Sequence, residues 1–291
     1  MSDQSRSILS VLERMSVLLS EAGVDPHPDA ELLLAHVLGE SRGRVQVLAL
    51  MGTELTEPQH DAALELAATR AERIPLQHLT GKAAFRRLEL EVGPGVFVPR
   101  PETEIVTQFA LDALAAAADP HPIAVDLCTG SGAIALSLAH ELPTAEVWAV
   151  EKSREAHAWA ERNVDTYGDG RVHLMLGDAA EARTLLDPLA GRVHVLVSNP
   201  PYVPSGMVPR EPEVRDHDPE LALYSGADGL DLIRVISVVA RDLVTSGGTL
   251  VLEHAELQGS AIRRILSADG WRATATHQDL TMRDRVTTAV R

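Results

Sequence analysis

The sequence has one cysteine and few aromatic residues, and each shortage excludes something. Its 291 residues include a single cysteine, Cys128, so an internal disulfide and a cysteine-based zinc cluster are excluded. Aromatic residues make up 3% of the chain, so the core is expected to consist mainly of Leu, Val and Ala. The N-terminal stretch MSDQSRSILSVLERMS has no long apolar run, so no signal peptide or membrane span is expected there. These features predict a cytoplasmic protein.

Basic residues are also scarce relative to acidic ones. The chain has 26 Lys and Arg against 42 Asp and Glu, a net charge of −16 at pH 7. Such a chain repels phosphate backbones, so no nucleic-acid partner is expected. The hydrophobic fraction of 45% is typical of a soluble globular protein, and the length suffices for one large domain or two ordinary ones.

Residues 1–78 are expected to form a small helical domain. Apolar residues recur at helical spacing between Ile8 and Leu19, and a second helix is expected over 29–38. A third is expected over 56–73, where Thr56 and Gln59 fit a capping box. The segment has no phosphate loop and no metal-ligand spacing. Its role is either packing alone or docking of a partner, and the sequence leaves both interpretations open.

Residues 79–100, LTGKAAFRRLELEVGPGVFVPR, alternate between apolar and polar around Gly93-Pro94-Gly95. This pattern predicts a β-hairpin that turns at these three residues and links two domains.

From about residue 122 onward, strand-like runs alternate with helical ones. The strand-like runs are IAVDLC, EVWAVE, VHLMLGD, VHVLVSN, GGTLVLEH and RVTTAV, and helices are expected at about 132–141, 153–164, 228–244 and 256–268. This order predicts an α/β fold with a doubly wound, mostly parallel sheet. Ligands bind such sheets at the carboxyl ends of the strands.

The first three of these strands end in residues suited to an adenosine cofactor. A glycine-rich turn, Cys128-Thr129-Gly130-Ser131-Gly132, follows the first strand and opens a helix, where free N–H groups favour polar ligand groups. Glu151 ends the second strand, where it can accept both ribose hydroxyls, and Asp178 ends the third, where it can meet an adenine amino group. The C-x-G-x-G spacing departs from the G-x-G-x-x-G dinucleotide fingerprint, which favours S-adenosylmethionine over NAD.

The fourth strand leads into a rigid corner, Asn199-Pro200-Pro201-Tyr202. The prolines hold an extended backbone, so the Pro200 carbonyl and the Asn199 side-chain oxygen are two fixed acceptors. Two acceptors suit a planar NH2 group with two donors on one nitrogen. Holding both hydrogens can expose the nitrogen lone pair toward a methyl donor, while Tyr202 walls the planar group.

Other polar residues offer weaker signals. The 12 histidines include no H-x-x-x-H or H-E-x-x-H pair, so no metal is expected. His254 ends a strand and is interpreted either as lining the cleft or as a satisfied strand-end residue. Asp216, His217 and Asp218 lie in a Pro-rich loop and are interpreted as solvated or substrate-facing.

The Asn-Pro-Pro-Tyr corner is the signature of amino-group methyltransferases that use S-adenosylmethionine, and nearly the whole chain resembles the HemK/PrmC protein-glutamine methyltransferases. Phe97–Glu104, FVPRPETE, resembles their (I/F)-x-P-R-P-x-T-E segment. Further similarity lies in DLCTGSGAIAL, EPEVRDHDPELALYSGADGLD, the LEH of 252–254, and RDRVTTAV. The resemblance implies a helical substrate-docking domain over 1–78, a hairpin linker over 79–100 and a Rossmann-like class I methyltransferase domain over 101–291.

The resemblance also implies an activity and a site. It implies methylation of the side-chain amide nitrogen (N5) of the glutamine in the Gly-Gly-Gln loop of peptide chain release factors, by a monomer, with S-adenosyl-L-methionine as cofactor and S-adenosyl-L-homocysteine as product. The implied catalytic residues are Asn199, Pro200, Pro201 and Tyr202. The implied cofactor-binding residues are Cys128, Thr129, Gly130, Ser131, Gly132, Glu151, Asp178, Ala179, Asn199, Phe97 and Arg100.

Two positions depart from the family pattern. Many members have glycine in place of Cys128, and many have a bulky aromatic residue in place of Ala179. We interpret Cys128 as a small strand-end residue rather than a nucleophile. Three alternatives stay open, namely a ribosomal-protein glutamine methyltransferase, an adenine-N6 DNA or RNA methyltransferase, and a non-catalytic cofactor-binding module.

Overall fold

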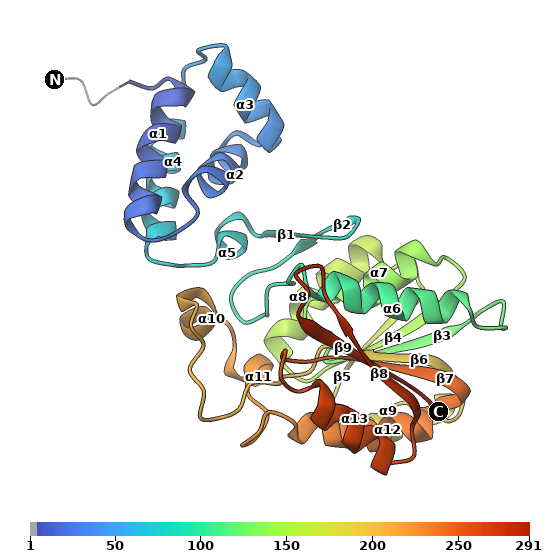
Figure 1. Ribbon diagram of the computed structural model, residues 1–291. Helices are drawn as coiled ribbons and strands as arrows, with labels where there is room; N and C mark the ends of the chain where they lie inside the picture. The colour runs from blue at the N-terminus through green and yellow to red at the C-terminus, as the bar shows by residue number, and fades with distance from the viewer. Residues whose placement is uncertain (1–4) are drawn as a thin grey trace. The chain divides into compact units, whose positions relative to one another are not determined.

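The computed structural model describes residues 5–291, and the chain forms two compact units (Figure 1). The first unit contains the N-terminal residues through Lys82 together with Pro209–His217. The second contains Ala83–Val208 and Asp218–Arg291. The chain therefore leaves the second unit shortly after the Pro-Pro corner and returns nine residues later. The expected boundaries at residues 78 and 100 stay predictions. No helix in the described part is long and apolar enough to cross a membrane.

The first unit is a small helical bundle, as the spacing predicted. Its N-terminal helices are α1 Ile8–Glu21, α2 Pro26–Leu38, α3 Arg42–Leu50, α4 Glu57–Ala71 and α5 Leu76–Thr80. Thr56 and Gln59 form the predicted capping box at the start of α4. The core is aliphatic, with Met15, Leu19 and Leu33 fully buried. α3 was not predicted, because Val45 is its one fully buried residue and it has no clear apolar face.

A short helix from far along the chain, α10 Pro212–His217, completes this unit. The Glu213 carboxylate pairs with Arg73 at 2.6 Å and with Arg70 at 2.8 Å. Arg70 also pairs with Asp29 of α2 at 2.7 Å. Burial raises the pKa of Glu213, but the hydrogen bonds from Arg73 and Arg70 outweigh it and lower that pKa to about 2. These charge-assisted contacts hold α10 in the helical unit.

The second unit is built on a seven-stranded sheet in the order β5-β4-β3-β6-β7-β9-β8. The strands are β3 Ile123–Leu127, β4 Glu146–Glu151, β5 Val172–Leu176, β6 Val193–Ser198, β7 Val244–Glu253, β8 Arg272–Gln278 and β9 Asp284–Val290. The strands from β5 to β7 run parallel, whereas β9 runs antiparallel to β7 and β8. The predicted mostly parallel sheet is confirmed. β8 was not predicted, because alanine is the only apolar residue type in its sequence RATATHQ.

Helices cover both faces of this sheet (Figure 1). One face carries α6 Thr103–Ala115, α7 Ala133–Glu141 and α8 Arg154–Tyr167, and the other carries α9 Ala182–Leu185, α12 Asp231–Leu243 and α13 Gly259–Ala268. The short α11 Glu220–Leu223 and two 3-10 turns, η1 Ala179–Glu181 and η2 Asp187–Leu189, lie in the connections. β3 lies between β4 and β6, so the strand order reverses there. Ligands bind open α/β sheets at such a switch point.

The predicted hairpin exists, but its turn lies elsewhere than expected. The strands are β1 Lys82–Phe85 and β2 Leu88–Glu91, so the chain reverses at Arg86-Arg87, with Arg86 at φ 51°. The Arg86 amide donates to Glu104 at 3.0 Å, which supports this backbone. Gly93 serves close packing instead, since a Cβ there would lie 2.4 Å from the ring of Trp159.

Candidate active site

The turn after β3 is built on a buried aspartate. Asp126 Oδ2 accepts hydrogen bonds from the Thr129 hydroxyl at 2.6 Å and from the Ala135 amide at 3.2 Å. Its Oδ1 has no hydrogen-bond partner among the described residues. Burial raises the pKa of the Asp126 carboxyl to about 7. The carboxyl thus fixes the turn and the first turn of α7 to the end of the strand.

Three residues of this turn have left-handed backbones, namely Cys128 at φ 64°, Gly130 at φ 60° and Gly132 at φ 85°. The amides of Cys128 and Thr129 both donate to the Val150 carbonyl, at 3.0 and 3.1 Å. Left-handed backbone suits glycine and strains a residue with a Cβ, which gives a physical reason for the glycine common at the Cys128 position. Burial raises the pKa of the Cys128 thiol, so the group stays protonated and is a poor nucleophile.

Glu151 shapes the same turn from the neighbouring strand. Its Oε2 accepts from the Gly130 amide at 2.9 Å and its Oε1 from the Ser153 amide at 2.7 Å. The residue is 8% exposed, and burial raises its pKa. Each carboxylate oxygen has a second lone pair, so both remain able to accept a further hydrogen bond. Glu151 therefore builds the turn and keeps two acceptor positions for a ligand.

Asp178 lies at the end of the next strand, beside Glu151. The Gly177 amide donates to the Glu151 carbonyl at 2.8 Å, which joins the two strand ends. The Asp178 carboxylate pairs with Lys152 at 2.7 Å and accepts from the Ala180 amide at 2.9 Å, and these contacts lower its pKa. Ala179 is buried. Lys152 was not predicted as a site residue, although it directly follows Glu151.

The Pro-Pro corner starts at the end of β6, next to the turn after β3. The Ser198 hydroxyl donates to the Leu127 carbonyl at 2.6 Å, which ties the two strand ends together. Asn199 Nδ2 donates to the Thr103 hydroxyl oxygen at 3.3 Å, so its Oδ1 is left as an acceptor. Pro200 is buried. The structure therefore brings the predicted catalytic corner to the predicted cofactor turn.

Tyr202 closes the corner and is held from several sides. Its hydroxyl lies 3.4 Å from Glu253 Oε1 at the end of β7, and its carbonyl accepts from Gln258 Nε2 at 2.9 Å. Burial and the Glu253 charge raise the pKa of the Tyr202 hydroxyl. Gly229 lies against the same carbonyl, since a Cβ there would come within 2.1 Å of the Tyr202 oxygen. The corner thus depends on Gly229, which lies in YSGADGLD, one of the stretches that resemble the HemK/PrmC family.

The FVPRPETE segment supplies a second set of contacts. The Arg100 guanidinium lies 4.8 Å from the centre of the Phe97 ring and pairs with Asp218 at 2.7 Å. The Asp218 side chain is fully buried, so it is not the solvated residue that the loop composition suggested. Thr103 begins α6 and reaches Asn199. The sequence did contain a signal for three residues that were not predicted as site residues. Each lies in a stretch that resembles the family, namely Thr103, Asp218 and Glu253.

His254 is a satisfied strand-end residue, one of its two predicted interpretations. It is fully buried, with Nε2 2.8 Å from the Thr287 hydroxyl and Nδ1 2.9 Å from the Ala255 carbonyl.

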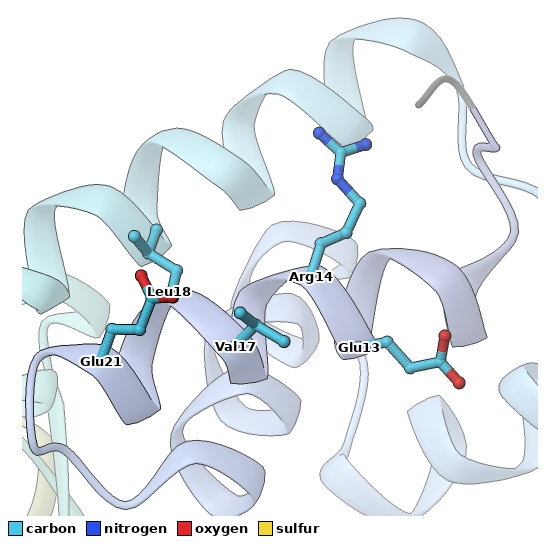
Figure 2. Close-up of a pocket in the computed structure, with 5 residues that line it drawn as sticks. All are labelled: Glu13, Arg14, Val17, Leu18 and Glu21. Carbon is cyan, nitrogen blue, oxygen red and sulfur yellow. The ribbon is translucent and has the colours of Figure 1, made fainter. Parts of the chain in front are cut away.

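A separate surface hollow lies on α1 of the helical unit (Figure 2). It is lined by Glu13, Arg14, Val17, Leu18 and Glu21. Arg14 lies 3.1 Å from the His60 ring. None of the predicted site residues lines this hollow, so a docking role for the helical unit stays a prediction.

The parallel sheet, the turn after β3 and the corner after β6 define a class I methyltransferase. Residues 10–81 match the PrmC N-terminal domain, and residues 87–209 match the methyltransferase small domain. The chain is 47% identical to a release factor glutamine methyltransferase of Streptomyces coelicolor, over 97% of each chain. It is 45% identical to one of Bifidobacterium longum, over 97% of this chain and 99% of the relative. The chain therefore belongs to the release factor glutamine methyltransferase family.

A more distant relative has a different printed name. The chain is 34% identical to a 4-amino-L-phenylalanine/4-methylamino-L-phenylalanine methyltransferase of Streptomyces pristinaespiralis, over 98% of this chain and 95% of the relative. The printed name of this relative gives an amino acid, and not a release factor, as the substrate.

Proposed function

We propose that this chain transfers a methyl group from S-adenosylmethionine to the side-chain amide nitrogen of the glutamine in the Gly-Gly-Gln loop of peptide chain release factors. The observation that carries the proposal is the orientation of Asn199. Its NH2 group is used by Thr103, so its oxygen is kept as an acceptor beside the rigid Pro200 carbonyl. Close similarity to relatives of that name supports the same substrate. We propose further that the chain acts in the cytoplasm, as a monomer.

The residues after β3, β4 and β5 fit an adenosine cofactor. Glu151 is buried and has two remaining acceptor positions, which suit the paired hydroxyls of a ribose. The Cys128–Gly132 turn would hold the polar groups next to the sugar, and Asp178 would accept from the adenine amino group. Phe97, Arg100 and Ala179 would line the rest of the site. When bound, S-adenosylmethionine supplies a methyl group on a positively charged sulfur.

The corner residues act on the amide nitrogen of the substrate. That nitrogen is a poor nucleophile because its lone pair is delocalised into the carbonyl. Asn199 Oδ1 and the Pro200 carbonyl would each accept one of its hydrogens, so the NH2 group is held with its lone pair free. Tyr202 would pack against the planar amide. The nitrogen would form the new bond to the methyl carbon while the carbon–sulfur bond breaks and neutral S-adenosyl-L-homocysteine leaves. The nitrogen would then release one proton to solvent, so no strong base is needed before transfer.

The test is mass spectrometry of a purified, unmethylated release factor after incubation with the protein and S-adenosylmethionine. We expect one added methyl on the glutamine of the Gly-Gly-Gln peptide. Ribosomal protein, DNA and 4-amino-L-phenylalanine are incubated in parallel. A methyl on one of these, and none on the release factor, would show that the methylated molecule, and not the release factor, is the substrate. No transfer to any of them would favour a non-catalytic cofactor-binding module.

A further inference from the structure

Gln258 lies directly before α13 and uses both ends of its side-chain amide. Its Nε2 donates to the Tyr202 carbonyl at 2.9 Å and to the Asp228 carbonyl at 3.1 Å. Its Oε1 accepts from the Ala255 amide at 3.0 Å. Because the NH2 group has two hydrogens, it can serve both carbonyls at once. A flipped amide would place an oxygen against two carbonyl oxygens, so the three partners fix one orientation of Gln258.

The three partners of Gln258 belong to three separate segments at one edge of the sheet. Tyr202 ends the corner after β6, Ala255 follows β7, and Asp228 lies in the connection before α12. β6 and β7 are adjacent and parallel, so their carboxyl ends lie side by side. The Asp228 loop has contacts of its own, since its carboxylate pairs with Arg234 at 2.5 Å. Gln258 therefore ties the corner to a neighbouring strand end and to a second loop.

The corner has few backbone donors of its own with which it could be held. Pro200 and Pro201 have no N–H group, so neither can donate a backbone hydrogen bond. The peptide group between Tyr202 and Val203, in contrast, is held at both of its polar atoms. Its carbonyl accepts from Gln258, and its N–H donates to the carbonyl of residue 223 at 2.8 Å. These two contacts set the plane of this peptide and the direction of the chain at Tyr202.

We propose that Gln258 is a positioning residue for the catalytic corner. By fixing the Tyr202–Val203 peptide, it sets the place of the Tyr202 ring and, through the rigid Pro201, the direction of the Pro200 carbonyl. In this role Gln258 acts through the corner and not by touching the substrate. The identity of the substrate rests on the proposed function, but the Tyr202–Val203 peptide can be observed without any substrate.

Asn163 offers a matched comparison, because its side-chain amide has the same pattern of three hydrogen bonds in another place. Asn163 Nδ2 donates to the Glu91 and Ser131 carbonyls, both at 2.9 Å, and its Oδ1 accepts from the Glu91 amide at 2.7 Å. Ser131 lies in the cofactor turn and not in the corner. Substitution of either residue therefore removes three hydrogen bonds, and only the segment that loses its support differs.

The experiment compares Gln258→Leu, which removes all three hydrogen bonds, with Gln258→Glu, whose ionised carboxylate keeps the acceptor for Ala255 but has no hydrogen for Tyr202. We expect each variant to lower kcat on the release factor roughly 10- to 100-fold, the scale of a misplaced reacting group, and to leave the KM for S-adenosylmethionine near the parent value. Asn163→Leu should instead raise that KM. Parent-like kcat in the two Gln258 variants, or a rise in their KM for S-adenosylmethionine as large as in Asn163→Leu, would overturn the proposal.

A second measurement observes the corner without any reaction. Tyr202-Val203 is the only Tyr-Val pair in the sequence, so tyrosine labelled with 13C at the carbonyl and valine labelled with 15N give a single NMR signal for this peptide group. Its chemical shifts should change in Gln258→Leu and Gln258→Glu and should stay in place in Asn163→Leu. Unchanged shifts in the Gln258 variants would overturn the proposal, whatever the enzyme methylates. Changed shifts with a parent enzyme that methylates no release factor would instead count against the proposed substrate and keep the role of Gln258.

Discussion

Asn199 and Thr103 lie 96 residues apart in the sequence, and the Asn199 side chain donates to the Thr103 hydroxyl oxygen at 3.3 Å. This single contact joins the corner after β6 to the start of α6. It also decides which atoms of Asn199 remain for a substrate.

The activity should depend on the ionisation of Glu253. Burial raises the pKa of this carboxyl to about 7, although the Thr103 hydrogen bond and Arg285 oppose the shift. Below that pH the carboxyl is protonated and is a weaker acceptor for the Tyr202 hydroxyl, which lies 3.4 Å from its Oε1, so kcat should rise as the pH increases through about 7. Steady-state kcat between pH 6 and 8.5 measures this. Glu253→Gln should be less active and lack the step.

Asp126 provides the control, because burial also raises its pKa to about 7. If Asp126→Asn rather than Glu253→Gln abolished the pH step, the ionisation would belong to the cofactor turn.

The same group should make the folded state less stable at higher pH. The folded Glu253 binds a proton more tightly than the unfolded one, whose pKa is near 4.5. The free energy of unfolding therefore loses this contribution as the pH rises from about 4.5 through about 7. Glu253→Gln should thus gain stability relative to the parent above pH 7. Urea unfolding at pH 5 and pH 8 checks this, and an equal difference between variant and parent at both values would contradict it.

Gly229→Ala should damage the corner. Gly229 has φ +76°, and an added Cβ would lie 2.1 Å from the Tyr202 carbonyl oxygen. Gly247→Ala is a matched control, because Gly247 has φ +83° but no atom within 4 Å of the added Cβ. Both variants carry the backbone strain, and only the first displaces Tyr202. We expect kcat to fall more than about tenfold in Gly229→Ala, the scale of a displaced catalytic group, relative to Gly247→Ala. Similar values would show that the clash is relieved without moving the corner.

Cys128→Gly should be more stable than Cys128→Ala by about 1 kcal/mol. The two variants both remove the thiol and differ only by a Cβ. At φ 64° the Cβ strains the backbone, so the usual advantage of alanine over glycine should reverse. Thermal unfolding of the two variants measures the difference. A more stable alanine variant would mean that the turn relaxes without cost.

Glu213→Gln should destabilise the helical unit by about 2 kcal/mol, the scale of charged hydrogen bonds, because it removes the carboxylate that pairs with Arg70 and Arg73. Asp216→Asn is the matched control on the same helix, since Asp216 is exposed and pairs only with its neighbour Arg215 among the pairs described. Asp216→Asn should have little effect.

The low pKa of Glu213 sets the pH window of this effect. The stabilisation should be present above about pH 4.5 and be lost as the pH falls toward 2, because the folded pKa is about 2. Urea unfolding at pH 7 and pH 3 measures both variants, and equal losses in the two variants at pH 7 would contradict the pairing.

Much of the fold could be predicted because its signals are local. The capping box at Thr56 and the strand runs that become β3 to β7 and β9 are sequence patterns of neighbouring residues. The turn of the hairpin was predicted at the wrong residues. A glycine is needed at position 93 because the Trp159 ring, which is distant in sequence, packs against it, and not because the chain turns there. The attachment of Pro212–His217 to the helical unit depends on ion pairs across 140 residues, so no local pattern could predict it.

In the candidate site, too, local patterns could be predicted and contacts between distant residues could not. The residues Cys128–Gly132, Glu151, Asp178 and the corner were predicted from their places at strand ends, and the structure brings them to one edge of the sheet. Their roles with cofactor and substrate stay predictions. Thr103 and Glu253 lie in stretches that resembled the family but were missed as site residues, because their contacts with Asn199 and Tyr202 join positions far apart in the sequence.

The most direct test of the account is the mass of the Gly-Gly-Gln peptide after reaction with the parent protein and with Asn199→Ala, each with S-adenosylmethionine. The account predicts a gain of one methyl on glutamine with the parent. It predicts that the rate falls roughly 100- to 1,000-fold in the variant, the scale of losing one aimed polar group in an active site. Full methylation by Asn199→Ala at the parent rate would contradict the role assigned to the corner. An unmodified glutamine in both reactions would contradict the proposed substrate.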